Sequence, residues 1–384
     1  MKRNLFRLPS FFLLIASVLL HASACISQSK TKPEVARKIN SPIDTDLRLR
    51  FTSGVRAILE DSHGNIWFGS NQEGICRFDG ESLTYFTLAD GLSNNQVRSI
   101  YEDANGVVWF ECGKGLSRYN GGRPDVVLGR SYSAKNDWQS TKTDLWFKGD
   151  EMSAYNNLEG QPGVYRYDGK ECIFQQFPLN GPAAVSDLYS FSTETPKINL
   201  SQYSVSTPFV RGKHGRLWFG TYGAVFGYDG TNFTTIDDKS LGRNEENGYL
   251  HVRSIFEDSQ GRLWIGNNGI GVMLYEGDSI THFSEKHHLI SENSGRRGGY
   301  RSPPGSLEHV FSIGEDADGN IWFGDRDTGA WRFDGETFQN YTIEDGLTTT
   351  HIWQIYRSKA GELWFALSDG SVSRFMGQGF ERIF

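Results

Sequence analysis

Residues 55–80 read VRAILEDSHGNIWFGSNQEGICRFDG, and this stretch decides the fold. Its first seven residues form an apolar strand, a Gly turn follows, and Ile66-Trp67-Phe68 opens a second strand. A third strand ends at Asp79-Gly80, and Leu83 to Thr87 supplies a fourth. The stretch therefore predicts a unit of four short strands joined by tight turns.

The central tripeptide of this unit recurs along the chain, with successive motif tryptophans between 37 and 72 residues apart. The copies are Ile66-Trp67-Phe68, Val108-Trp109-Phe110, Leu145-Trp146-Phe147, Leu217-Trp218-Phe219, Leu263-Trp264-Ile265, Ile321-Trp322-Phe323 and Leu363-Trp364-Phe365. A period of about 40 residues is typical of propeller blades, and longer spacings indicate insertions. We expect an all-β fold, a seven-bladed β-propeller of four-stranded antiparallel blades over residues 46–384, with the motif tryptophans buried between blades.

The turns between third and fourth strands carry a recurrent Asx-Gly pair. The pairs are Asp79-Gly80, Asn120-Gly121, Asp168-Gly169, Asp229-Gly230 and Asp334-Gly335. Because Asp-Gly and Asn-Gly favour two residues with positive φ, we expect type I′ hairpins here.

Paired carboxylates recur at one position of the blade, before the turn that precedes the Trp strand. The pairs are Glu60-Asp61, Glu102-Asp103, Glu257-Asp258 and Glu315-Asp316. Such pairs can serve acid and base catalysis, but their repetition favours a structural role in which Asp accepts hydrogen bonds from its own turn. The loop that begins at Asp316 resembles a calcium-binding loop, but its Gly is misplaced and no Glu closes it, so we do not expect it to bind calcium.

The N-terminus resembles an export signal. Basic residues precede an apolar run from Leu8 to Leu20, and small residues lead to Cys25, so we expect residues 1–24 to be a signal peptide. The bond before Cys25 fits an ordinary secretory peptidase, but the Cys and the polar tether over residues 25–45 favour a lipoprotein anchored by acyl chains on Cys25. If Cys25 is lipidated, the protein is anchored in the cell envelope, at the outer membrane or facing the periplasm. If it is not, we expect a periplasmic or secreted protein.

Composition and charge narrow the function classes. The net charge of −7 disfavours nucleic acid as a partner, because duplex binding needs a basic surface. Cys76, Cys112 and Cys172 lie in predicted strands without metal-ligand spacing, so we expect buried, inert thiols.

The repeat resembles the two-component regulator propeller repeat of bacterial hybrid histidine kinase sensor regions. The residues that carry the resemblance are Val55-Arg56-Ala57-Ile58-Leu59-Glu60-Asp61 through Asp79-Gly80, and Asp90-Gly91-Leu92-Ser93-Asn94-Asn95-Gln96-Val97. The third blade departs most, because it lacks the Glu-Asp strand. The resemblance implies a propeller that binds carbohydrate or another extracytoplasmic ligand, and we expect signalling to need a separate partner protein.

The long insertions fall in the links from fourth strands to the next first strands, which share one face of a propeller. These links are Pro178 to Pro208, Asp237 to Tyr249 and Ser284 to Glu308. Long loops on a rigid scaffold commonly bind ligands. Tyr249, Tyr300 and Arg301 are the ligand-binding candidates that these loops supply.

Four polar residues stand immediately before the first apolar residue of a predicted inner strand, namely Gln96, His251, His309 and His351. Equivalent positions converge at the mouth of the central channel. Three imidazoles there can hold a divalent metal, polarise a substrate or hydrogen-bond sugar hydroxyls, or they can satisfy neighbouring loop backbone. The sequence assigns no metal, no catalytic residue and no cofactor.

Three functions remain open. The first is a sensor-like, non-catalytic envelope module that binds a carbohydrate, a peptide or a partner protein on the insertion-rich face. The second is a metal-dependent enzyme similar to streptogramin lyases, and the third is a structural scaffold of an envelope complex. Ring closure is also open, because residues 379–384 and residues 46–51 can each supply the last strand of blade seven.

Overall fold

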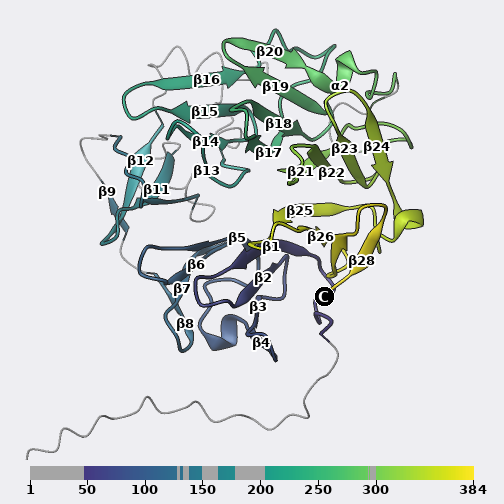
Figure 1. The fold of residues 1–384 in the computed structure, drawn as a ribbon. Coiled ribbons are helices and arrows are strands. Elements are labelled where there is room, and N and C mark those ends of the chain that lie inside the picture. The colour runs from purple at the N-terminus through teal and green to yellow at the C-terminus, as the bar shows by residue number, and fades with distance from the viewer. Residues whose placement is uncertain are drawn as a thin grey trace, which may run out of the picture. The chain divides into compact units, whose positions relative to one another are not determined.

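The structure, a computed structural model, describes residues 47–127, 130–132, 138–148, 163–177, 204–292, 294 and 300–384. The predictions for the signal peptide, Cys25, the tether and most of the link Pro178 to Pro208 lie outside these residues. Within them, the four-stranded sheets form a seven-bladed β-propeller, as the repeat predicts (Figure 1).

Six blades run in simple order, each with neighbouring antiparallel strands. Blade one is β1 (Val55–Glu60), β2 (Ile66–Ser70), β3 (Ile75–Phe78) and β4 (Leu83–Phe86), and blade two is β5 (Val97–Glu102), β6 (Val108–Cys112), β7 (Gly115–Tyr119) and β8 (Pro124–Val126). Blade four is β13 (Val210–Arg211), β14 (Leu217–Gly220), β15 (Ala224–Tyr228) and β16 (Phe233–Asp237). Blade five is β17 (Val252–Glu257), β18 (Leu263–Asn267), β19 (Val272–Glu276) and β20 (Ser279–His282). Blade six is β21 (Val310–Glu315), β22 (Ile321–Asp325), β23 (Ala330–Phe333) and β24 (Phe338–Tyr341), and blade seven is β25 (Ile352–Arg357), β26 (Leu363–Leu367), β27 (Val372–Phe375) and β28 (Phe380–Arg382).

Among the described residues, three short helices lie in links between blades. They are η1 (Leu88–Asp90), α2 (Phe283–Lys286) and η4 (Ile343–Asp345). The two 3₁₀ turns share one design, in which Thr87 or Thr342 caps the turn and a left-handed Gly ends it. These links return the chain from the outer strand of one blade to the inner strand of the next.

Blade three is the exception, as the weak repeat there predicts. Its sheet has the order β10 (Leu145–Phe147), β11 (Gly163–Tyr167), β12 (Cys172–Gln176) and β9 (Arg130–Tyr132). The outermost strand, β9, pairs parallel to β12, whereas the other pairs in the sheet are antiparallel. Among the described residues this sheet starts with its Trp strand, β10, at the position that a second strand holds in the other blades.

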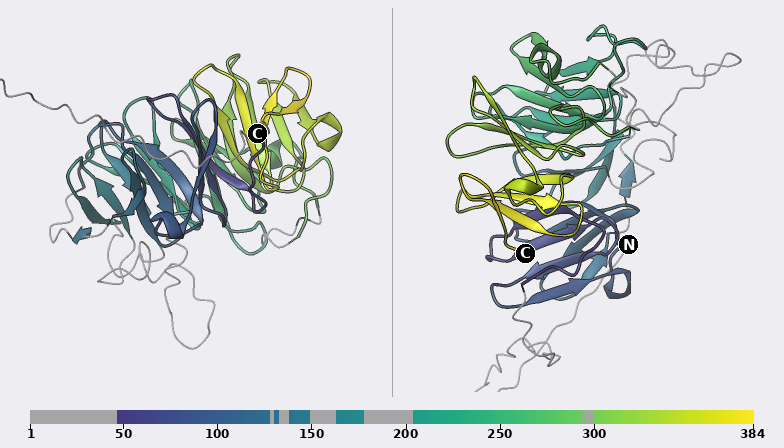
Figure 2. Two further views of the ribbon diagram at one scale, coloured as in Figure 1. Left: turned by 90° about the horizontal axis from the view of Figure 1, so that it is seen from below. Right: turned by 90° about the vertical axis from the view of Figure 1, so that its right-hand side faces the viewer.

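The first strands meet at the centre of the ring. β1 contacts β5 and β25, and β21 contacts β17 and β25 (Figure 1). The turned views of Figure 2 show the sheets of neighbouring blades side by side around this centre. The N-terminal ends of the first strands therefore gather on one face, together with the links that enter them.

Each blade interface has its own hydrophobic cluster, and each cluster contains one motif tryptophan. Trp67, for example, is fully buried against Val97, Ile100 and Phe110 of the next blade. The same arrangement holds for Trp109, Trp146, Trp218, Trp264, Trp322 and Trp364. The prediction that these rings lie between blades is confirmed, since large flat side chains fill the space between two packed sheets.

The recurrent Glu-Asp pair divides its work between two blades. Asp61 accepts hydrogen bonds from the backbone N–H groups of His63 and Asn65 at 2.9 and 2.8 Å, and from the Trp67 indole N–H at 2.7 Å. The Trp–Asp bond recurs in blades two, five and six. Glu102 instead accepts from the backbone N–H of Ser62 in the preceding blade at 2.8 Å. The structural interpretation of these carboxylates is confirmed.

The prediction of type I′ hairpins is wrong. Gly80, Gly121, Gly169, Gly230 and Gly335 have positive φ, but the one described non-glycine residue with positive φ is His288. In blade one the loop spans four residues, and Asp79 accepts from the N–H groups of Glu81 and Ser82 at 3.1 and 2.8 Å. These side-chain bonds hold Asp in an ordinary backbone conformation, so one left-handed residue is enough for the turn.

Blade seven closes the ring with its own last strand. β28 pairs antiparallel with β27, and Leu49 and Phe51 pack without strand structure in the cluster between blades seven and one, beside Phe384. A hydrogen bond also crosses the seam between blades seven and one, from the Ile58 N–H to Gln354 Oε1 at 2.7 Å. The C-terminal strand, rather than residues 46–51, therefore completes the blade.

Candidate functional site

Five first strands share one irregularity close to their N-terminal ends. The register against the second strand shifts between Val55 and Ala57, Val97 and Ser99, Val252 and Ser254, Val310 and Ser312, and Ile352 and Gln354. Each shift leaves one residue unpaired, namely Arg56, Arg98, Arg253, Phe311 and Trp353. A β-bulge of this kind turns a side chain out of the regular alternation of a strand. We call these five side chains the bulge residues.

The bulge residues contact one another across blade boundaries. The Arg56 guanidinium lies 4.5 Å from the centre of the Trp353 ring, and Arg253 lies 4.5 Å from that of Phe311. The Phe311 and Trp353 rings meet edge to face at 5.4 Å. These contacts join blades five, six, seven and one, so the bulges direct their side chains toward the common centre.

Positive charge dominates this centre. Burial, together with the charges of Arg253 and Arg98, lowers the pKa of Arg56 to about 10. Lys148, at the end of β10, is buried and its pKa is lowered to about 8 by burial, although Glu111 opposes the shift. Lys148 pairs with Glu111 at 3.7 Å. Among the described residues, no ion pair involves Arg56, Arg98 or Arg253.

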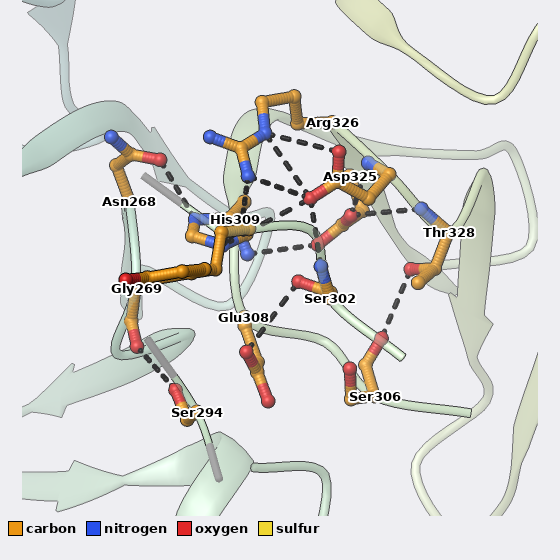
Figure 3. Close-up of polar contacts among 12 residues, drawn as sticks. Asn268, Gly269, Ser294, Ser302, Ser306, Glu308, His309, Asp325, Arg326 and Thr328 are labelled. Atoms are coloured by element: carbon orange, nitrogen blue, oxygen red, sulfur yellow. Dashed lines mark hydrogen bonds and ion pairs between the residues drawn. The ribbon is translucent and has the colours of Figure 1, made fainter. Parts of the chain in front are cut away.

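The structure brings two of the predicted histidines together. The Asn268 amide bridges them, with its Oδ1 atom 2.7 Å from His309 Nδ1 and its Nδ2 atom 3.3 Å from His251 Nδ1. His309 is fully buried, and its Nε2 atom lies 3.1 Å from the Tyr300 carbonyl oxygen (Figure 3). Burial lowers the pKa of both imidazoles to about 4, so both are neutral at pH 7.

His351 takes a different environment. Its ring packs on Trp353 at 4.4 Å and against the edge of Phe311. Burial lowers its pKa to about 4, and its Nε2 atom is buried without a hydrogen-bond partner in the described structure. In the described part of the chain, no three His, Cys, Asp or Glu side chains are grouped to hold a metal ion.

Gln96 lies beside a hollow between blades one and two, at the edge of this centre. Its Oε1 atom accepts from Arg98 Nε at 2.9 Å, and its Nε2 atom lies 3.5 Å from Asn71 Oδ1. The hollow has a volume of about 340 Å³ and is also lined by Asn94, Asn95 and Lys114. Gln96 therefore lies at the edge of this hollow.

The link between blades five and six is fastened to blade six. The Ser302 N–H donates to Asp327 Oδ2 at 3.0 Å, Thr328 Oγ1 donates to the Ser306 carbonyl at 2.9 Å, and Arg326 Nη2 donates to the Tyr300 carbonyl at 2.5 Å (Figure 3). These bonds hold the chain around Tyr300 against His309. A fixed link of this kind can position side chains for binding.

The three loop candidates have different placements. The Tyr300 side chain is 75% exposed, and Arg301 is exposed beside it. Tyr249 is half-buried, two residues before His251. The structure therefore places Tyr300 close to the histidines through its backbone, and presents its ring to solvent.

Sequence reasoning overlooked the bulge residues. Their signal is present in the repeat, because an Arg follows the first apolar residue in Val55-Arg56, Val97-Arg98 and Val252-Arg253. The predicted histidines lie two positions earlier, immediately before the same strands. Regular alternation gives no reason to place both positions at the centre, and the bulge supplies that reason.

The sequence of four blades matches a family model described as two component regulator propeller, over residues 51–72, 91–110, 248–269 and 304–327. Four blades of this chain therefore carry the two-component regulator propeller repeat. All four matched segments of this regulator propeller run through a bulge, at Arg56, Arg98, Arg253 and Phe311. A comparison with curated proteins found no match.

Solved structures share the fold of this regulator propeller. The extracellular domain of a hybrid two-component system from B. thetaiotaomicron aligns over 83% of this chain and 38% of its own, with 18% identity and a TM-score of 0.57. The extracellular domain of a one-component system from the same organism aligns over 85% and 39%, with 19% identity and a TM-score of 0.56. A streptogramin B lyase aligns over 87% and 96%, with 14% identity and a TM-score of 0.54.

The regulator propeller thus spans about two fifths of the length of those two extracellular domains. At these identities the likeness concerns the fold. Among the described residues, no helix has the length and the apolar character needed to cross a membrane.

Proposed function

We propose that this regulator propeller is an exported, ligand-binding module that acts as the recognition part of a sensor, with its ligand at the centre of the insertion-rich face. The observation that carries the proposal is the bulge shared by five blades, which directs Arg56, Arg98, Arg253, Phe311 and Trp353 to one place. Strands that serve only the fold have no need of a common irregularity at this position.

The chemistry of this centre suits recognition. It combines aromatic rings with guanidinium, imidazole and amide groups, and such mixtures bind carbohydrates and peptides through stacking and hydrogen bonds. The candidates from the sequence, Gln96, His251, His309 and His351, adjoin the bulge residues, and Tyr249, Tyr300 and Arg301 lie on the links around them. We include all seven in the proposed site.

Export and anchoring belong to the same proposal. The repeat shared with two-component regulator propellers and the leader before Cys25 support a location in the cell envelope, with Cys25 as the lipidated residue. A separate signalling protein is the proposed partner. The alternatives of a lyase-like enzyme and of a scaffold have no supporting contact among the described residues, so we retain the binding module.

The test is binding of purified protein to saccharide and peptide arrays, together with native mass spectrometry of protein isolated from its own envelope. We expect a retained or array-bound small ligand, lost in Gln96→Ala and Trp353→Ala. Gln339→Ala is the matched control, because Gln339 is exposed on the outer strand β24. Circular dichroism checks that each variant is folded. Failure of every ligand to bind, or equal binding by all variants, contradicts the proposal.

A further inference from the structure

The hollow between blades one and two has an unusual polar lining. Its residues are Asn71, Gln72, Leu88, Asn94, Asn95, Gln96, Arg98, Gly113 and Lys114. Two of these side chains are cations and five are amides, and none is a carboxylate. The protein has a net charge of −7. Its average composition therefore does not account for a hollow whose polar side chains are all cations or amides.

Except at the exposed Gln72, the amide oxygens of this lining already accept hydrogen bonds. Asn94 Oδ1 accepts the Gln96 backbone N–H at 2.8 Å, and Asn95 Oδ1 accepts the Leu88 backbone N–H at 2.8 Å. Asn71 Oδ1 accepts from Arg56 Nη1 at 3.2 Å. These bonds fix the orientation of the three amides, so that each has its NH₂ group left over as a donor.

The cations of the lining also have donors to spare. Arg98 uses its Nε–H for Gln96 Oε1, and neither terminal nitrogen of its guanidinium has a hydrogen-bond partner among the described residues. Lys114 is exposed at the rim, with no ion pair in the described part of the chain. With the exception of the exposed Gln72, the unused side-chain groups of the hollow are therefore all donors.

The turn itself does not require these amides. The link between blades six and seven forms the same capped 3₁₀ turn and carries Thr349 and Thr350 at the corresponding positions. There the Thr349 hydroxyl, at 3.5 Å, accepts the N–H of His351 as Asn94 accepts that of Gln96. Because Thr349 serves the turn without leaving an NH₂ group, the NH₂ group of Asn94 is not required by the local fold.

From these contacts we propose that the hollow binds the oxyanion of a ligand, a carboxylate, sulfate or phosphate group held by Arg98, Lys114 and the amide NH₂ groups of Asn71, Asn94 and Asn95. An ionised oxyanion has only acceptors, and guanidinium forks bind its oxygens with charge-assisted hydrogen bonds. Arg56, bonded to Asn71, adds a third positive charge behind the amides. The volume of about 340 Å³ is at the lower end of the range of small-ligand sites.

This inference deepens the proposed function and rests on it, because it names the chemical class of the ligand. Two sources can provide such a group, a free inorganic oxyanion or an acidic sugar. The amides favour an acidic sugar, since they can also donate to hydroxyl groups next to the carboxylate.

The experiment is isothermal titration calorimetry of the full chain at low ionic strength, where charge screening is least. The probes are galacturonate, its neutral counterpart galactose, and sodium sulfate with sodium chloride as the control for ionic strength. We expect galacturonate to bind at least about tenfold more tightly than galactose, a difference of about 1.4 kcal/mol. Tighter binding of sulfate than of galacturonate identifies the free oxyanion as the source and also supports the oxyanion site.

Two variants locate the site. Arg98→Gln is expected to weaken binding of galacturonate or sulfate about tenfold or more, and Lys114→Gln to weaken it in the same direction. Arg118→Gln is the matched control, because this exposed arginine of blade two pairs with Asp125 on the outer strand. The thermal unfolding midpoint of each variant without ligand checks the fold.

Equal affinity for galactose and galacturonate, no binding of any anion, or an unchanged affinity in Arg98→Gln overturns the inference. Neutral saccharide binding that is lost in Trp353→Ala while every anion fails leaves the proposed function intact and removes only the oxyanion site. Failure of all ligands in the array experiment as well removes both.

Discussion

The bond between a turn carboxylate and the motif tryptophan offers the sharpest test of how the blades are held. Asp61 is 2% exposed and accepts four hydrogen bonds, from His63 N, Asn65 N, Asn65 Nδ2 and Trp67 Nε1 at 2.7 to 2.9 Å. These bonds lower the pKa of Asp61 even though burial acts to raise it. The perturbation that we consider is Asp61→Ala.

The magnitude follows from what each lost bond leaves behind. The Trp67 indole is fully buried, so its N–H cannot turn to water, and a buried unsatisfied donor costs about 1–3 kcal/mol. His63 is exposed and Asn65 is half-buried, so their donor groups can reach water, and we assign them about 1 kcal/mol together. The expected loss of unfolding free energy is about 3 kcal/mol. With an unfolding entropy of about 2.1 cal/mol/K per residue, this lowers the thermal midpoint by about 4 °C for a domain of this size.

The assay is urea unfolding followed by tryptophan fluorescence, supported by differential scanning calorimetry. Asp79→Ala is the control, because Asp79 also accepts hydrogen bonds in a blade-one turn but is exposed and binds no indole. We expect the control to lose less than about 1 kcal/mol. A double-mutant cycle with Trp67→Phe should show a coupling of about 1.5 kcal/mol between Asp61 and the indole N–H. Equal losses at Asp61 and Asp79, or no coupling in the cycle, would refute the reasoning.

Three further outcomes follow from the contacts at the seam, the centre and the blade cores. Glu60 accepts the backbone N–H of Lys359 across the seam between blades seven and one at 2.5 Å. Glu60→Gln should therefore lower the free energy of unfolding in urea by about 1 kcal/mol. Glu81→Gln, at an exposed position, is the control and should be neutral. His309 is 1% exposed, and its pKa is about 4 in the folded protein and about 6.5 in the unfolded chain. The unfolded state therefore binds the proton more tightly, and the free energy of unfolding should fall by up to about 3 kcal/mol as the pH drops from 6.5 to 4. In calorimetry at pH 7.5 and 4.5, His309→Gln should lose less stability on acidification than the wild type. Cys76, whose pKa burial raises to about 12, should not react with a disulfide reagent at pH 8 until urea unfolds the blade, and reaction in the native state would contradict its assignment as an inert core thiol.

Much of the fold could be predicted because it depends on features that repeat. The Trp tripeptide, the Glu-Asp pair and the Asp-Gly turns each occur at a fixed place in the blade, and the seven interface clusters follow from the tripeptide alone. Blade three could be recognised as irregular, yet nothing in the sequence indicated that β9 would pair parallel with β12. Strand pairing there depends on where the chain returns to the sheet edge, and local sequence does not record that return.

The candidate site could be predicted only in part. The position before each first strand indicated that His251 and His309 would approach the centre, and Asn268 does join them. Nothing in the sequence indicated Asn268, because it lies in the turn after β18, outside the repeated positions of the blade. The Arg that follows the first apolar residue in three blades is a signal for Arg56, but a regular strand that buries Val55 inward would turn the next side chain away.

The bulge separates the residues that make the fold from those that can serve a ligand. At the bulge of five blades the backbone makes the same register shift, and the residue before it is a fully buried Val or Ile in each case. The unpaired residue nevertheless changes from Arg in three blades to Phe and Trp in two others. Because the backbone accepts all three residue types, the bulge does not dictate which one is present. The choice is then left to what the side chains meet at the centre, and there two of the three arginines stack on aromatic rings and the third faces a hollow whose unused groups are nearly all donors. These identities, which the fold leaves free, support the proposed binding of a negatively charged ligand at this centre.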